Sequence, residues 1–375
     1  MQDFVIQRAR KLGYYTIAID GSAEAIGLQH ADKGAVINIV DEQACYEFAE
    51  EEGIDGILTV ATDFGVLSTS YIAEKLGLPG LKYESAKRIK NKYEVRKRLI
   101  EAHVDDTHEA YEVDKDSVLK DLTIHYPVMV KPCDGSGSRA TRRVDCLEEL
   151  KSACADAIAT SRIHRALIEA FVVGREYGAE SIVVNGEIHV LGIMKKWMTD
   201  PPYYAELGHQ IPSELPTETE QKARACVEKA IRVLEINHGA VNMDLIISPS
   251  DDVHIIDVGA RMGGNMIGPC VIPIGTGISY MDNLIRTAVG DEPNWSMKDP
   301  CKVCTRLLAF KGGRVNELPD FKTLENRYKV KIYHHMHAGD VISEYHTNLD
   351  GCGYIIAGDA ETADKVLSEI ALYVE

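Results

Sequence analysis

A lysine at the end of an apolar segment precedes a stretch rich in glycine and serine, an order of residues that suits a phosphate group. Residues 126–131 read YPVMVK, which predicts a strand ending at Lys131, and residues 132–140 read PCDGSGSRA. Backbone N–H groups of such a loop can approach phosphate oxygens closely, and the lysine adds positive charge. Glycine and serine clusters also form plain turns, so both interpretations stay open. The motif matches neither the Walker sequence nor the spaced glycines of a dinucleotide fold.

Two aspartates further along have the placement of a divalent-cation site. Asp244 lies in GAVNMDLII (239–247) and Asp257 in VHIIDV (253–258), and these segments predict antiparallel strands joined by residues 249–252. Carboxylates brought together across such a pair repel each other unless a cation lies between them, and hard oxygen ligands suit Mg²⁺. Arg261 follows in GARMGGN (259–265), beside the expected metal.

Glu169 and Glu176 flank an apolar stretch that could face a purine. They lie in residues 166–197, which predict a strand, a turn and a hairpin with Asn185 and Gly186 at its corner. A charged rim on an edge strand is the simpler interpretation of these glutamates taken alone.

The order of the motifs resembles that of the ATP-grasp superfamily. It runs through Lys92, Lys131 with its loop, Glu169-x-Phe171, Gly174-x-Glu176, Lys195 or Lys196, Asp244, and Asp257-x-Gly-x-Arg261. Residues 196–216 look like the substrate loop of the carboxylate–amine ligases in that superfamily, the group that contains bacterial L-amino-acid ligases and carbamoyl-phosphate-synthase-like ligases. The resemblance spans nearly the whole chain, and so many motifs in the correct order are hard to obtain by chance.

The resemblance implies a binding site for ATP. Lys92 and Lys131 would hold the α and β phosphates, and the β and γ phosphates would be covered by Ser136, Gly137 and Ser138. The adenine edge would meet Glu169 and the backbone of Ala170, Phe171 and Val172, and the ribose hydroxyls would meet Glu176. The γ phosphate would contact Lys196 or its neighbour Lys195.

The resemblance also implies a metal site and a substrate site. Asp244 and Asp257 would bind Mg²⁺, which Mn²⁺ could replace, and Glu206, His209 and Arg261 resemble the residues that grip an amino-acid-like substrate. Family metal ligands are commonly Glu, with an Asn two positions after the second, where this chain has Gly259. For Arg261 the alternative is a structural role in tying down the glycine-rich residues 262–268.

The elements that must position these residues fall into three predicted parts. Strands at 15–19, 35–40 and 56–60 alternate with helices at 43–52 and 66–76, which predicts a parallel sheet covered on both faces in an α/β domain over residues 1–83. That domain opens on a helix at 3–12 and lacks the family's first strand, which raises a late start codon as an explanation. A basic helix at 86–102 begins an α+β ATP-grasp domain over residues 84–300, and residues 301–375 would complete the cleft.

Composition excludes several function classes. The chain has 375 residues and a net charge of −17, which argues against nucleic acid and anionic membranes as partners. Its 9 cysteines favour a reducing compartment, most simply the cytoplasm. Cys301 and Cys304 form one CxxC without a second pair, and residues 334–337 hold too few aligned histidines for a metal. The uncharged run 262–281 contains many glycines and prolines, which predicts loop and turn instead of a membrane span.

The expected activity is therefore that of an ATP- and Mg²⁺-dependent ligase. It would activate a small carboxylate as an acylphosphate and join it to an amine, releasing ADP and phosphate. Two alternatives stay open: an enzyme that activates bicarbonate, such as a carboxylase or a carbamoyl-phosphate-type enzyme, and a degenerate module that binds nucleotide without turnover. The sequence leaves a homodimer open and does not identify the acid or the amine.

Overall fold

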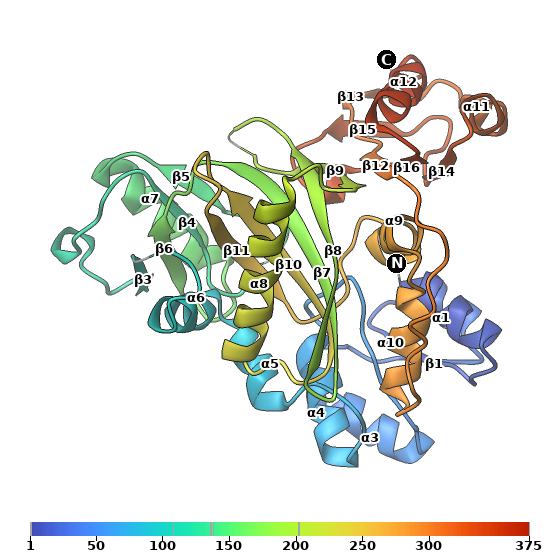
Figure 1. Ribbon diagram of the computed structural model, residues 1–375, viewed down its shortest axis with the longest axis horizontal. Helices are drawn as coiled ribbons and strands as arrows, with labels where there is room; N and C mark the ends of the chain where they lie inside the picture. The colour runs from blue at the N-terminus through green and yellow to red at the C-terminus, as the bar shows by residue number, and fades with distance from the viewer. Residues whose placement is uncertain (1, 108, 136, 138, 202, 375) are drawn as a thin grey trace.

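An eight-stranded antiparallel sheet runs through the middle of the computed structural model, which describes residues 2–107, 109–135, 137, 139–201 and 203–374 (Figure 1). The strand order is β11-β10-β7-β8-β9-β12-β16-β14. The strands are β7 (Arg175–Val184), β8 (Glu187–Met198), β9 (Glu206–Ile211), β10 (Gly239–Ile247), β11 (Val253–Gly259), β12 (Val303–Leu307), β14 (Lys331–His334) and β16 (Gly353–Ala357). The hairpin predicted at Asn185 and Gly186 joins β7 to β8, and the antiparallel pair predicted for the two aspartates is β10 with β11.

Helices cover the two faces of this sheet. α8 (Thr217–Val233) buries Ala223, Val227, Ala230 and Ile231, whose spacing forms one helical stripe against β8 and β11. Beneath the opposite face lie a π-helical turn (Ile267–Val271), α9 (Ile272–Thr276) and α10 (Tyr280–Ala288). The predicted loop at 262–281 is thus wrong in large part, because its apolar residues pack as short helices in the core.

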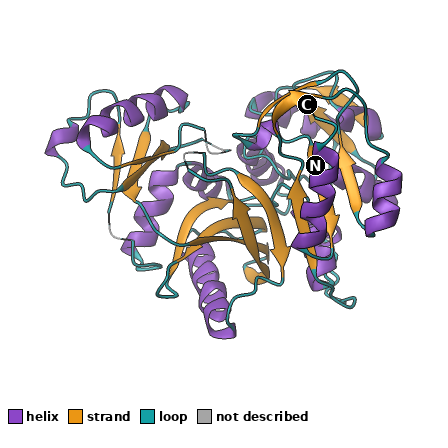
Figure 2. Ribbon diagram, turned by 90° about the horizontal axis from the view of Figure 1, so that it is seen from above, coloured by secondary structure: helices purple, strands orange, loops and turns teal. Residues whose placement is uncertain are grey.

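A four-stranded sheet with one covering helix forms a separate lobe (Figure 2). Its order is β3-β6-β4-β5, with β3 (Ala110–Val113), β4 (Val128–Pro132), β5 (Arg142–Val144), β6 (Ala166–Ala170), α7 (Leu147–Thr160) and a short 3₁₀ turn (Leu119–Asp121). Leu150, Ala153 and Ala157 of α7 pack against Val128, Val130 and Ile168 of the sheet. β4 ends at the position predicted for the phosphate loop.

The parallel sheet of the N-terminal region has fewer strands than the sequence pattern predicts. It contains α1 (Gln2–Lys11), β1 (Ile17–Asp20), α2 (Ile26–His30), β2 (Lys33–Val36), α3 (Glu42–Glu52), α4 (Val66–Leu76) and α5 (Tyr83–Lys90). β1 and β2 form a parallel pair, but residues 56–59 form no strand, and Val60 only bridges Met262. A Cβ on Gly56 would lie 2.4 Å from the Ala288 carbonyl oxygen, so this segment packs against the end of α10 instead of extending the parallel pair.

The predicted helix at 86–102 is two helices. α5 ends at Lys90, and α6 (Lys92–Glu101) begins after Asn91, whose side chain accepts a hydrogen bond from the Tyr93 amide at 2.9 Å. Asn91 has an extended backbone and caps α6, which accounts for the break.

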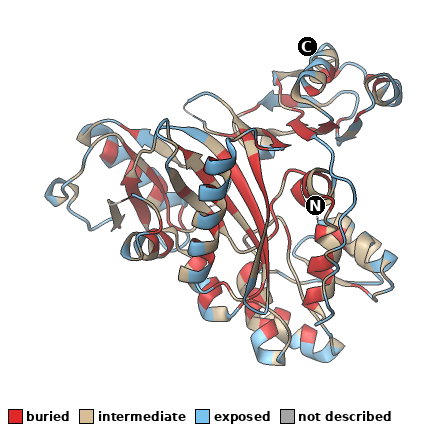
Figure 3. Ribbon diagram, viewed as in Figure 1, coloured by how far each residue is buried: buried red, intermediate tan, exposed pale blue. Residues whose placement is uncertain are grey.

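The C-terminal region extends the large sheet. β12, β14 and β16 belong to that sheet, and they are flanked by β13 (Lys311–Arg314), α11 (Phe321–Tyr328), β15 (Val341–Glu344), a 3₁₀ turn (Asn348–Asp350) and α12 (Ala360–Ala371). Buried residues concentrate on strands such as β7, β8 and β12, whereas β1, β2, β13 and β14 have none (Figure 3). No helix among the described residues is long and apolar enough to span a membrane.

Candidate active site

A cavity of about 950 Å³ is lined by residues of the eight-stranded sheet and the four-stranded sheet, and also by residues 61–64. That volume is at the upper end of the range for small-molecule sites. Most of the site residues predicted from the sequence line it: Lys92, Lys131, Gly137, Glu169, Ala170, Phe171, Val172, Glu176, Lys196, Glu206, Asp244, Asp257 and Arg261. Ser136 and Ser138 fall outside the described residues. Segments far apart in the sequence therefore converge on one space.

One end of the cavity is built on a closed set of ion pairs, here called the Glu169 cluster: Arg96, Asp105, Lys131 and Glu169. The Glu169 carboxylate is 2.6 Å from Lys131 Nζ and 2.9 Å from Arg96 Nε. Arg96 also pairs with Asp105 at 3.1 Å, and Lys131 donates to the Ile256 carbonyl at 2.8 Å. Burial alone would raise the pKa of Glu169, but the charges of Lys131 and Arg96 outweigh it and hold that pKa below its usual value. The cluster ties β4, β6 and α6 to β11.

The two aspartates predicted to bind metal lie directly opposite each other. Asp244 of β10 is paired in register with Asp257 of β11, as the antiparallel prediction requires. Lys92 donates to both carboxylate oxygens of Asp257, and Lys196 lies 2.8 Å from Asp244. Burial would raise the pKa of Asp257, but Lys92 and Lys131 lower it below its usual value. Each aspartate thus has a lysine as its present counter-charge.

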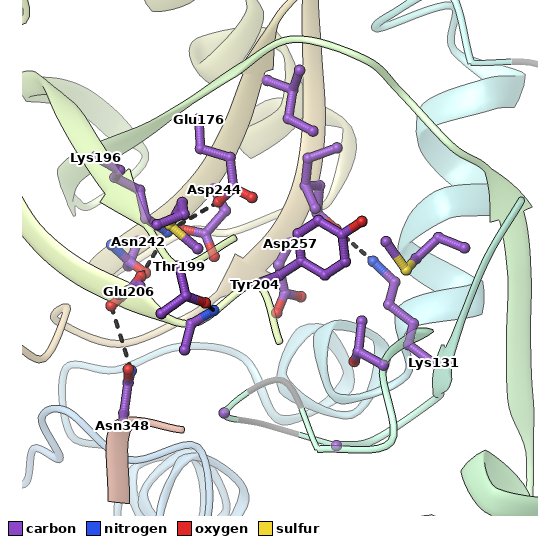
Figure 4. Close-up of a pocket in the computed structure, with 18 of the residues that line it drawn as sticks. Lys131, Glu176, Lys196, Thr199, Tyr204, Glu206, Asn242, Asp244, Asp257 and Asn348 are labelled. Atoms are coloured by element: carbon purple, nitrogen blue, oxygen red, sulfur yellow. Dashed lines mark hydrogen bonds and ion pairs between the residues drawn. The ribbon is translucent and has the colours of Figure 1, made fainter. Parts of the chain in front are cut away.

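The other end of the cavity has one lysine among several carboxylates, a group called here the Lys196 cluster: Glu176, Lys196, Glu206 and Asp244 (Figure 4). Lys196 Nζ is 2.6 Å from Glu206, 2.8 Å from Asp244 and 3.7 Å from Glu176. Burial, reinforced by Asp244 and Glu206, raises the pKa of Glu176 to about 7 against the opposing effect of Lys196. Lys195 also lines the cavity, but its amine pairs with Glu214 at 2.7 Å, whereas the amine of Lys196 lies among the three carboxylates of the cluster.

Glu206 is hydrogen-bonded to Asn265 and to the C-terminal region. Asn265 donates to its carboxylate, the Asn348 side-chain nitrogen lies 3.5 Å from that carboxylate, and the Tyr345 hydroxyl donates to its carbonyl oxygen. His209 is buried behind this residue, with Nε2 3.9 Å from the Glu206 carboxylate. Burial lowers the pKa of His209, which favours the neutral imidazole. The structure therefore places His209 behind Glu206 and not among the residues that line the cavity.

The contacts of the Arg261 side chain differ from those expected from its place beside residues 262–268. Instead of carbonyls of residues 262–268, its guanidinium meets the Asp63 carboxylate at 3.1 and 3.3 Å and the Asn242 side-chain oxygen at 3.2 Å. The alternative prediction, that Arg261 ties down residues 262–268, is thus wrong, because its hydrogen-bond partners are Asp63 and Asn242. Burial would lower the pKa of Arg261, but Asp63 raises it above the usual value.

Comparisons with known proteins bear on this site. Residues 124–269 match the ATP-grasp domain family. Residues 124–269 are therefore an ATP-grasp domain, and the chain has the ATP-grasp fold. It is 24% identical over 345 residues to the uncharacterized protein y4rH of Sinorhizobium fredii (strain NBRC 101917 / NGR234), which covers 90% of this chain and 70% of that protein.

Solved structures share the ATP-grasp fold. An L-amino acid ligase from Bacillus licheniformis superposes with a TM-score of 0.84 at 22% identity, covering 100% of this chain and 95% of that chain. The biotin carboxylase domain of the Hydrogenobacter thermophilus 2-oxoglutarate carboxylase, in complex with MgADP, ADP and bicarbonate, has a TM-score of 0.76 at 18% identity, covering 100% of this chain and 88% of that chain. The resemblance to the superfamily and the α/β and α+β fold class are confirmed.

Sequence reasoning missed several residues that line this cavity or contact its lining. Asn242 could have been found, since it lies two positions before Asp244 and alternate strand residues share a face. The same argument connects Glu180 with Glu176 on β7. Asp63 gave no local signal, because it reaches Arg261 across 198 residues of sequence.

The two aspartates fit a divalent cation chemically, but they do not form a complete ligand shell by themselves. Among the described residues no group of three or more His, Cys, Asp or Glu side chains surrounds a common metal position. Asp244 and Asp257 nevertheless offer hard oxygens on neighbouring strands, the ligand type that Mg²⁺ prefers. Both carboxylates are now satisfied by lysines, which would have to release them.

Proposed function

We propose that this chain is an ATP- and Mg²⁺-dependent ligase that joins a carboxylate, amino-acid-like in character, to an amine. The observation that carries the proposal is the charge pattern of the cavity. Its Lys196 cluster has three carboxylates and one lysine, and the opposed pair Asp244 and Asp257 connects this cluster to Lys92. Such an excess of carboxylate next to lysines suits a polyphosphate that arrives with divalent cations.

ATP would lie along the cavity from the Glu169 cluster to the Lys196 cluster. Lys131 and Lys92 would meet the α and β phosphates, while Gly137 would lie in the loop above them. The adenine would contact the backbone of Ala170, Phe171 and Val172, and Glu176 would accept hydrogen bonds from the ribose. The Glu169 carboxylate is already bound on both oxygens, so we assign it to holding Lys131 in place.

The reaction would proceed in two displacements. A carboxylate oxygen of the acid attacks the γ phosphorus of ATP, the bond to the bridging oxygen breaks, and ADP leaves with that electron pair. The amine then attacks the acyl carbon of the acylphosphate, loses a proton, and expels inorganic phosphate. The chain's contribution is positioning and charge neutralisation, for which Lys196 is placed near the γ phosphate.

Asp244 and Asp257 would hold the magnesium that accompanies ATP. A bound Mg²⁺ supplies charge neutralisation on the transferring phosphoryl group. Arg261 and Glu206 would orient the acid, because a guanidinium matches a carboxylate and a carboxylate matches an ammonium group. His209 acts through Glu206. We place the reaction in the cytoplasm, in keeping with the free cysteines of the described chain.

The test is a substrate screen. The full chain is incubated with ATP, Mg²⁺ and pooled amino acids, and ADP, AMP and phosphate are measured separately. We expect ADP and phosphate release that requires the pool, and an amide product by mass spectrometry. AMP as the product would contradict the acylphosphate route. ATP binding without release of ADP in any pool would favour a module that binds nucleotide without turnover.

A second candidate is activation of bicarbonate, favoured by the similarity to a biotin carboxylase domain whose structure contains MgADP and bicarbonate. It uses the same ATP residues and differs in the acceptor. ADP release that depends on bicarbonate and proceeds without any carboxylic acid would support this candidate over the ligase.

A further inference from the structure

The guanidinium of Arg261 is held from two sides. Asp63 accepts from Nε at 3.1 Å and from Nη2 at 3.3 Å, and Asn242 accepts from Nη1 at 3.2 Å. A guanidinium has five N–H groups, so these contacts among the described residues use three of them. One N–H on each terminal nitrogen remains. A carboxylate can accept hydrogen bonds from both of these nitrogens at once.

The segment that carries Asp63 is fastened beside the segment that carries Arg261. Val60 forms a parallel bridge with Met262, and the Ala61 amide donates to the Met262 carbonyl at 3.0 Å. These backbone contacts are independent of the Asp63 side chain. They hold the backbone that precedes Asp63 beside the segment of Arg261.

Asn242 is fastened just as firmly. Its side-chain nitrogen donates to Glu180 at 2.9 Å, and Glu180 also accepts from the Tyr280 hydroxyl at 2.6 Å and from the Gly263 amide at 2.9 Å. Glu180 is fully buried, and a Cβ on Gly263 would lie 2.9 Å from its carboxylate. Rotation of Arg261 would therefore break a buried hydrogen-bond network as well as the ion pair.

We propose that Asp63 is a positioning residue for the acid substrate, because it fixes Arg261 so that the two remaining N–H groups form the carboxylate-binding site. The inference rests on the proposed ligase function. It also limits the class of ligand. Asp63 cancels much of the Arg261 charge, so the site recognises a carboxylate by hydrogen-bond direction, and we expect it to prefer a singly charged carboxylate to a doubly charged phosphate.

Asp63→Asn in the full chain tests the proposal. ADP release is measured with ATP and Mg²⁺ at increasing amino-acid pool, and then at increasing ATP. We expect the KM for the pool to rise by about 10- to 100-fold and the KM for ATP to change by less than about twofold. Inhibition by inorganic phosphate should strengthen, since the guanidinium charge is no longer cancelled. Asp63→Glu keeps the carboxylate and should recover part of the pool affinity.

Asp282→Asn is the matched control. Asp282 pairs with Arg8 and joins α1 to α10 away from the cavity, so its loss removes a charged contact of the N-terminal region without touching Arg261. We expect a lower unfolding temperature and an unchanged KM for the pool.

Each other result has a definite meaning. A tighter KM for the pool in Asp63→Asn would show that Asp63 competes with the acid and would overturn the proposal. An equal rise in the KM for ATP and in the KM for the pool, with a loss of thermal stability, would make Asp63 a structural residue and would also overturn the proposal. An active wild type with an unaffected Asp63→Asn would overturn this inference alone. A wild type without acid-dependent turnover would overturn the proposed function, and this inference with it.

Discussion

The Glu169 cluster and the Lys196 cluster use the same side-chain types at opposite ends of one cavity, yet their charges are balanced differently. In the first, Lys131 and Arg96 face Glu169 and Asp105, so cations and carboxylates are equal in number. In the second, Lys196 faces Glu176, Glu206 and Asp244. Lys131 and Arg96 outweigh burial and keep the pKa of Glu169 low. In the second cluster burial raises the pKa of Glu176 to about 7, while Lys196 outweighs burial at Glu206 and lowers that pKa to about 2.

The difference indicates what each end is for. A buried ion pair with every charge matched needs nothing further, and it fastens the small lobe to β11. A cluster short of positive charge has an unfavourable electrostatic free energy. Cations or phosphate-bound metal would lower that free energy. The comparison predicts that changes in the first cluster have their main effect on folding. Around the second cluster, including Asp257 and Arg261 beside it, the main effect should be on turnover, with a smaller, pH-dependent effect on stability.

The largest effect is expected from Glu169→Gln. Removing one partner leaves Lys131 and Arg96 buried without their common counter-charge, which costs about 3–5 kcal/mol of unfolding free energy. Chemical denaturation monitored by circular dichroism measures it. Glu235→Gln, which breaks an exposed pair with Arg88, is the control and should change stability by less than about 0.5 kcal/mol. A folded, stable Glu169→Gln would break the comparison.

Asp257→Asn should act on turnover instead. It removes one charge from the pair proposed to hold magnesium, and we expect kcat to fall by at least about 100-fold with a much smaller loss of stability. Steady-state ADP release at saturating Mg²⁺ measures this. Asp252→Asn, in the exposed turn that joins β10 to β11, is the matched control and should leave kcat unchanged. Near-wild-type turnover in Asp257→Asn would refute the metal assignment.

Arg261→Lys should have an intermediate effect. The lysine keeps the charge but loses the planar donors, so acid-dependent turnover should fall by about tenfold while ATP affinity changes little. Calorimetric titration with ATP and kinetics with the amino-acid pool separate the two quantities. If ATP affinity and thermal stability fall together, Arg261 is structural and the acid must bind nearer Glu206.

The smallest effect concerns pH. Because the pKa of Glu176 is raised to about 7 in the folded protein, the folded state binds more protons than the unfolded state between the ordinary glutamate pKa and about 7. This contribution to stability is present at low pH and is lost as pH rises towards 7. Glu176→Gln should flatten the slope of stability against pH by about 1 kcal/mol per pH unit within that interval. Denaturation midpoints at several pH values measure it, and an unchanged slope would place the titration elsewhere.

Sequence patterns predicted the elements that local residues determine. Alternating apolar residues located β7, β8, β10 and β11, and the pairing of Asp244 with Asp257 followed from the antiparallel turn between them. Helix periodicity failed at Asn91, where a cap interrupts one apolar stripe. The glycines and prolines of residues 262–281 predicted a loop, but the apolar residues between them form short helices that pack in the core.

The partners inside the site were beyond prediction for a physical reason. Lys92 with Asp257 and Arg261 with Asp63 are contacts across 165 and 198 residues, and they depend on how separate elements dock. The motifs predicted which residue types lie in the site. The choice between Lys195 and Lys196 depended on which side chain of β8 reaches Asp244 of β10 across β7.

The sheet pairing between β9 and β12 sets a lower limit on how far this protein can be trimmed. Ile211 and Gln210 of β9 are paired with Val303 and Cys304 of β12, and the Tyr345 hydroxyl reaches the backbone of Glu206. A fragment limited to residues 124–269, or a chain ending at residue 300, would leave β9 as a bare strand edge. Such an edge can pair with other chains, so premature stop codons late in the gene should yield an aggregating product and not a shortened, folded protein.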